Sequence, residues 1–97
     1  GLKSIFEDDY KNIGKEQISL IREISEHISA INSKVEEMTE ERKKANNIEH
    51  AAERADVYCN HVKPIFETIR YHCDKLELLV DDEMWTLAKY RELLFTR

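Results

Sequence analysis

Apolar residues between Ile48 and Val80 recur in steps that alternate four and three residues, the spacing of a heptad repeat on one long helix. A second, largely apolar row lies beside the first, and the row on the other flank is charged. The resulting stripe is wider than one partner helix can cover, which predicts that this helix is covered by at least two neighbours in a bundle. The first row is Ile48, Ala52, Ala55, Cys59, Val62, Phe66, Ile69, Cys73, Leu76 and Val80; the second is Ala51, Tyr58, Ile65, His72 and Leu79; the charged row is Glu49, Asp56, Lys63, Arg70 and Glu77.

An earlier segment, about 15–45, carries a narrower apolar row with the same spacing and predicts another long helix. One flank of this row bears the small polar residues Ser25, Asn32 and Thr39, which allow a partner to come close but bury little apolar area. Arg42 holds one position of the row, where its charged head can reach water. The row is Ile21, Ile24, Ile28, Ile31, Val35, Met38, Arg42 and Ala45.

Between the two rows, Asn46 and Asn47 interrupt the pattern. Asn46, followed by Glu49, has the spacing of a helix N-cap with its capping-box partner. A break this short predicts either an antiparallel hairpin of helices at about 15–45 and 47–82, which we favour, or one bent continuous helix. Pro64 should bend the second helix without ending it, because the heptad spacing continues across it.

Shorter elements are expected at the two ends of the chain. Residues 2–12 place Leu2, Ile5, Phe6 and Tyr10 on one side of a short helix, which Gly14 is expected to end. After Asp81 the large apolar residues leave the heptad pattern, so this tail either folds back across the bundle or docks on another subunit. The candidate interface residues are Trp85, Leu87, Tyr90, Leu94 and Phe95. The predicted fold is an all-α helical bundle, with residues 1–97 forming a single helical domain.

Composition supports long helices and excludes some partners. The chain is 36% charged, has 2 Gly and 1 Pro, and carries a net charge of −5 without a basic run. This balance argues against nucleic acid and anionic membranes as partners. Its apolar runs are too short to span a membrane, and no signal peptide is visible. Cys59 and Cys73 would lie about 20 Å apart on one helix, which predicts reduced, buried thiols in a cytoplasmic protein.

Residues for catalysis or metal binding are not recognisable. Gly1 and Gly14 cannot form a phosphate-binding loop, and no Cys-x-x-Cys or His-Glu-x-x-His pattern occurs. The histidines never fall three or four residues apart, and the acidic run 81–83 points its side chains in different directions on a helix. The sequence therefore predicts no catalytic, cofactor-binding or metal-binding residue. The histidines are His27, His50, His61 and His72.

The closing stretch LELLVDDEMWTLAKYRELLF resembles the C-terminal end of the type III glutamine synthetases. The matching positions include Trp85, Lys89 and Tyr90, and Thr86 and Ala88 stand where that family commonly has proline. The resemblance extends upstream through RADVYCNHVKPIFETIRYHCDKLE and ISLIREISEHISAINSKVEEM, so that it covers nearly the whole chain.

This resemblance implies the helical C-terminal domain of a much larger cytoplasmic enzyme that joins ammonia to glutamate. Gly1 in place of Met is expected for a cleaved tag or an excised fragment, although a processed native start would look the same. The family uses ATP and a divalent metal, magnesium or manganese, and assembles as stacked hexameric rings. None of its catalytic or metal-binding residues maps onto this chain. The implied partners are the chain's own catalytic domain and neighbouring subunits, with a role in subunit packing and folding. The alternative is a free-standing helical adaptor that binds partner helices. In either case the isolated chain is expected to self-associate.

Overall fold

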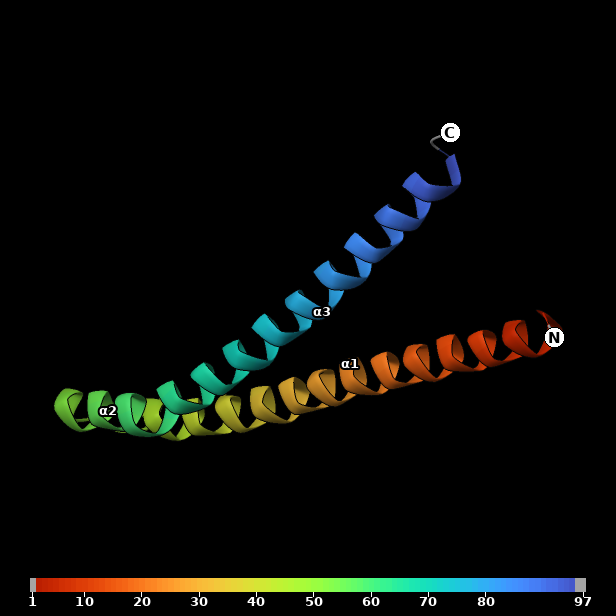
Figure 1. Ribbon diagram of the computed structural model, residues 1–97. Helices are drawn as coiled ribbons and strands as arrows, with labels where there is room; N and C mark the ends of the chain where they lie inside the picture. The colour runs from red at the N-terminus through yellow and green to blue at the C-terminus, as the bar shows by residue number, and fades with distance from the viewer. Residues whose placement is uncertain (1, 96–97) are drawn as a thin grey trace.

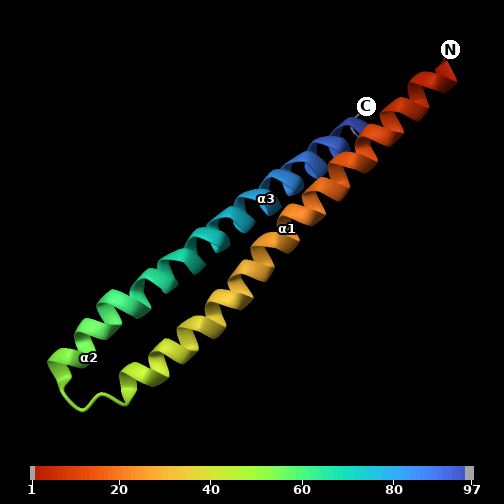
Figure 2. The same cartoon turned by 90° about the horizontal axis from the view of Figure 1, so that it is seen from below.

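The computed structural model describes residues 2–95, and within this range the side chains of 2–6 and 10 are not described. The chain consists of α1 (Leu2–Asn46), α2 (Ala51–Val57), the π-helix η1 (Tyr58–Val62) and α3 (Lys63–Phe95) (Figure 1). The last three form one continuous helical arm, which returns antiparallel to α1 (Figure 2). No strand occurs in residues 2–95. The predicted all-α helical hairpin is therefore confirmed.

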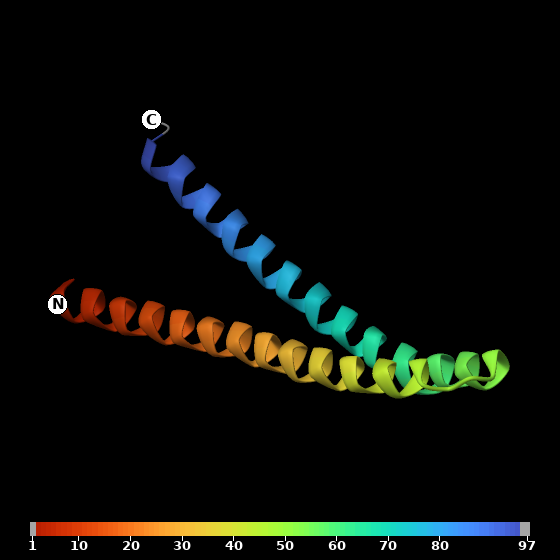
Figure 3. The same cartoon turned by 180° about the vertical axis from the view of Figure 1, so that it is seen from behind.

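The hairpin is a single layer of helices. It measures 74 × 28 × 14 Å and has a radius of gyration of 21.8 Å, whereas a compact domain of this length would have about 13 Å. The two arms lie together at the closed end and diverge toward the termini, as Figures 1 and 3 show from opposite sides. The accessible surface is 8543 Å², against roughly 5,800 Å² for a compact monomer of this mass. Much apolar surface therefore stays outside.

The bend predicted at Pro64 is confirmed, and the π-helix before it explains how the helix survives the proline. Pro64 has no N–H to donate and its ring would clash with the carbonyl of Asn60. In η1 the N–H of Lys63 donates to the carbonyl of Tyr58, five residues back, which widens the turn just before the ring. The hydroxyl of Thr68 then donates to the Pro64 carbonyl at 3.1 Å. The arm changes direction here and continues as α3 (Figure 1).

The turn between the arms differs from the predicted N-cap at Asn46. Asn46 is the last residue of α1, and the N-cap of α2 is His50, whose side chain makes no capping bond. The Asn46 side chain is used across the hairpin instead, where its Oδ1 accepts a hydrogen bond from the Tyr58 hydroxyl at 2.5 Å. This bond ties the end of α1 to the first turns of the second arm.

The predicted short N-terminal helix is wrong, because α1 runs unbroken through Gly14. No glycine or other residue in the described range has a positive φ, the conformation that a helix-ending glycine adopts. Helix formers surround Gly14, and one interior glycine costs only about 1 kcal/mol, which a helix of this length tolerates. The predicted apolar side at Leu2, Ile5, Phe6 and Tyr10 lies outside the described side chains.

The predicted folded-back tail is also wrong, since α3 continues straight through Phe95. After Asp81 the chain has no proline or glycine to stop a helix, and it is rich in Leu, Ala, Lys, Arg and Glu, which favour one. The Thr86 hydroxyl bonds the Asp82 carbonyl at 2.9 Å, which is the local pattern of a threonine within a helix.

The contact between the arms uses only part of the predicted stripe. Ala45, Val62 and Ile65 are the buried apolar residues in the described range. On α3 the half-buried positions continue from Ile65 through Ile69, His72, Leu76 and Leu79, so the second predicted row faces α1 together with alternate residues of the first row. Phe66 of the first row is 53% exposed. The predicted burial of Cys59 and Cys73 is wrong, although both are free thiols as expected.

This register makes a testable prediction. Ile65→Ala removes a buried side chain from the contact between the arms and should lower the free energy of unfolding by about 2–3 kcal/mol. Phe66→Ala removes a larger side chain from the solvent side and should cost no more than about 1 kcal/mol. The measurement is urea unfolding followed by circular dichroism at low protein concentration. Equal or reversed costs would mean that the arms pack in the other register.

Candidate interaction face

One side of the hairpin carries two exposed apolar rows at heptad spacing, which we call the apolar face. Each row lies next to the row that makes the contact between the arms, so contact with a single partner helix leaves it uncovered. Phe66, Val80 and Leu87 are each at least half exposed, and Ile21 of α1 is 64% exposed. The face consists of Ile21, Ile28 and Val35 from α1 and Cys59, Phe66, Cys73, Val80, Leu87 and Leu94 from η1 and α3.

A groove between the arms shows that both rows belong to the same side. Arg42, seven residues beyond Val35, lines this groove together with Cys59 and Phe66, and Met38 and Val62 also line it. The remaining lining residues are Ala55, Tyr58 and Lys63. Its volume of about 700 Å³ is in the range of small-molecule sites, but it is an open trough. The described residues provide no buried polar group to orient a ligand there. A helix is a better match than a small molecule.

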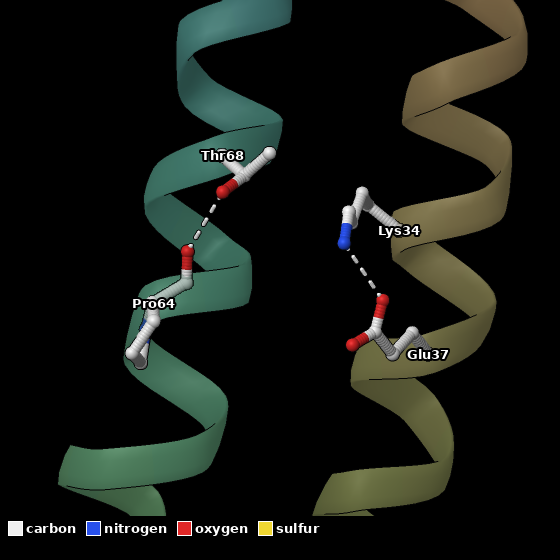
Figure 4. A network of polar contacts seen from close by, with 4 residues as sticks. All are labelled: Lys34, Glu37, Pro64 and Thr68. Atoms are coloured by element: carbon white, nitrogen blue, oxygen red, sulfur yellow. Dashed lines mark hydrogen bonds and ion pairs between the residues drawn. The ribbon is translucent and has the colours of Figure 1, made fainter.

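The other side of the contact is polar. Lys34, Glu37 and Glu41 of α1 face His61 and Thr68 of the second arm across a smaller hollow. Lys34 forms an ion pair with Glu37 at 3.0 Å on its own helix, and Thr68 bonds Pro64 on the other arm (Figure 4). Lys34, Glu37 and Thr68 thus already have polar partners within their own helices.

A pair of histidines links the arms near the middle of the hairpin. The Nδ1 atoms of His27 and His72 lie 2.9 Å apart, so one ring donates and the other accepts. Both rings are half-buried, and the edge of His72 also meets the Tyr71 ring at a centroid distance of 5.2 Å.

The candidate interface residues predicted from sequence are all exposed on the C-terminal arm, but they do not share one side. Leu87 and Phe95 line a hollow on α3, and Leu94 continues the apolar face. Tyr90 lines a groove facing α1, and Trp85 lies against Lys89, whose Nζ is 5.6 Å from the indole centroid. Sequence reasoning missed Ile21, Ile28, Phe66 and Val80 as surface residues because it assigned them to the core. Whether any of them forms an interface stays a prediction.

The described residues include no cluster of three or more His, Cys, Asp or Glu side chains that could hold a metal ion. No helix in that range is both long enough and apolar enough to cross a membrane. What the described chain presents is an all-α hairpin with an unpartnered apolar face.

Comparison with known proteins identifies a relative. The chain is 48% identical over 97 residues to a glutamine synthetase from Bacteroides fragilis (strain YCH46), and the match covers 99% of this chain. It spans 13% of the length of that relative. No family model matches the chain, and no solved structure matches it. The chain is therefore a homologue of a segment of glutamine synthetase, which confirms the resemblance found in the sequence, while its assignment to type III stays a prediction.

The histidine pair makes a testable prediction about the coupling between the arms. His27→Ala and His72→Ala each remove the 2.9 Å hydrogen bond, so either substitution alone should lower the free energy of unfolding by about 1 kcal/mol. The double variant should cost less than the sum of the two single variants, with a coupling free energy of about 0.5–1.5 kcal/mol.

The control is the pair His50→Ala and His61→Ala, two exposed histidines whose costs should simply add. Urea unfolding followed by circular dichroism at one constant pH measures all of these variants. Additive costs for His27→Ala and His72→Ala would contradict the prediction.

Proposed function

We propose that this chain is the non-catalytic C-terminal helical domain of a type III glutamine synthetase, and that it contributes to subunit packing and folding. The observation that carries the proposal is the 48% identity to a glutamine synthetase, which extends over the whole hairpin and not over one helix alone. Helical hairpins share heptad spacing by convergence, but heptad spacing alone does not produce identity at nearly half of all positions.

The proposed parent enzyme joins ammonia to glutamate with ATP and a divalent metal, magnesium or manganese. The residues described here do not suit those groups, because they hold no cluster of three potential metal ligands. The two glycines, Gly1 and Gly14, stand too far apart to make a phosphate-binding loop. In this proposal ATP, metal and the catalytic residues belong to the remainder of a cytoplasmic parent enzyme.

The packing role rests on the shape of the hairpin. A single layer of helices buries little of its own apolar surface, and stable domains are built from at least two layers. The apolar face would gain its second layer from the parent's catalytic part or from a neighbouring subunit of stacked hexameric rings. A free-standing adaptor would also use this face, but the adaptor hypothesis gives no reason for the identity with glutamine synthetase.

The proposal predicts that the apolar face matters in the full-length protein that carries this sequence. Val80→Glu places a charge in the middle of the face and should shift the protein from its largest assembly to smaller species or aggregates. Light scattering after size-exclusion chromatography measures the assembly, and ATP-dependent glutamine formation measures the activity.

Ser29→Glu is the matched control, because it adds the same charge at an exposed position of α1. It should leave both assembly and activity unchanged. A full-length Val80→Glu protein with the normal mass and turnover would contradict the packing role. A native polypeptide no larger than this chain, without ligase activity, would contradict the parent enzyme and favour the adaptor.

A further inference from the structure

We propose that the apolar face is the docking site of one further α-helix, whose own apolar heptad row is bordered by acidic side chains. This inference rests on the proposed packing role and names the chemistry of the partner. It follows from the spacing of the exposed rows and from the charges that border the groove.

The spacing of the exposed residues requires a helical partner. On α3 the exposed apolar positions recur every seven residues from Phe66 through Cys73, Val80 and Leu87 to Leu94. On α1 they recur with the same period at Ile21, Ile28 and Val35. Two antiparallel rows with this period form the holes into which the knobs of a third helix insert. An extended strand, with its period of two residues, could not match them.

The outer flank of α1 allows a close approach. Beside Ile21, Ile28 and Val35 run the exposed residues Ser25, Asn32 and Thr39, which are small and uncharged. Thr39 bonds the carbonyl of Val35 at 2.8 Å, so its hydroxyl is already satisfied within α1. A partner helix that covers this threonine would therefore bury neither a charge nor an unsatisfied hydroxyl.

The charges bordering the groove favour an acidic partner. Arg42 and Lys63 line it, and no carboxylate does. Neither cation forms an ion pair in the part of the chain that the structure describes. The lysines on other sides of α1 differ, because Lys34, Lys43 and Lys44 each pair with a glutamate of the same helix. Arg42 has no acidic residue three or four positions away on α1. An acidic row on a docked helix would supply the missing partners.

The area left bare is sufficient for such a partner. The chain exposes 8543 Å², which exceeds the roughly 5,800 Å² of a compact monomer by more than the roughly 1,200–2,000 Å² that a stable interface buries. A second copy of the chain could cover the same surface, but it would bring Arg42 and Lys63 again to a groove that already holds both. Self-association through this face should therefore be weaker than binding of an acidic helix.

The experiment uses synthetic amphipathic peptides of four heptads as probes. One has leucine at the two core positions of each heptad and glutamate at the flanking positions, and the other has lysine in place of glutamate. Analytical ultracentrifugation and fluorescence titration would follow binding to the 97-residue chain at low salt. The glutamate peptide should bind about tenfold more tightly than the lysine peptide and should dissociate any self-associated chain.

Variants of the chain separate the two parts of the proposal. Arg42→Glu/Lys63→Glu should reverse the preference in favour of the lysine peptide, and Phe66→Glu should weaken binding of both peptides. Lys43→Glu is the control, since this residue pairs with Glu40 in an exposed position outside the groove and should leave the preference intact.

Each outcome decides the question. Equal binding of both peptides, or preference for lysine, would overturn the acidic partner. A stable dimer that excludes both peptides would assign the face to a second copy. A loss of assembly in full-length Val80→Glu together with no peptide preference would keep the packing role and reject only the chemistry inferred for the partner.

Discussion

The structure depends on one constraint, which is that a helix with a wide apolar stripe cannot be covered by a single neighbour. In this hairpin α1 contacts the row of α3 that includes Ile65 and His72. The adjacent row, which includes Phe66 and Val80, is thereby turned to solvent. The exposed surface, the thin shape and the apolar face all follow from this division of the stripe between an inner and an outer row.

Packing is tight at the closed end and loosens along the arms. Ala45 is fully buried and Val62 nearly so, and the Tyr58–Asn46 hydrogen bond ties the arms together close by. The π turn before Pro64 redirects the second arm there, and beyond it α1 and α3 diverge. Large residues near the C-terminus, such as Phe95, stay exposed because no second layer reaches them. The His27–His72 bond is a polar tie between the arms in the middle of the hairpin.

Heptad spacing alone predicted the two long arms, their antiparallel return and a stripe too wide for one partner. It could not predict which row faces α1, because the rows of Ile65 and Phe66 have the same period and similar apolarity. The register across the turn decides which of the two rows faces α1, and the π-helix adds an extra residue to this register. Local signals at Gly14 and Asn46 were outweighed by the propensity and cooperativity of long helices. The candidate interface residues are exposed on the last turns of α3, and their role in an interface stays a prediction. The tail was expected to fold back across the bundle, but Thr86 and Ala88, which stand where the resembling family commonly has proline, allow a straight helix.

The exposed rows and the relationship to glutamine synthetase bear on each other. A hairpin that functioned alone would be expected to carry polar residues at Phe66, Val80 and Leu87, because exposed apolar rows promote aggregation. The chain is 48% identical to a glutamine synthetase in which the matched segment makes up 13% of the length. In such a protein the rest of the polypeptide or a neighbouring subunit can provide the second layer permanently. The two sides of the hairpin differ in their charges. In the polar hollow Lys34 is already paired, whereas in the groove Arg42 and Lys63 are not. This difference indicates that the proposed second layer covers the side with the groove. The proposed packing role accounts for this difference between the two sides of the hairpin, which a free-standing hairpin would leave without a reason.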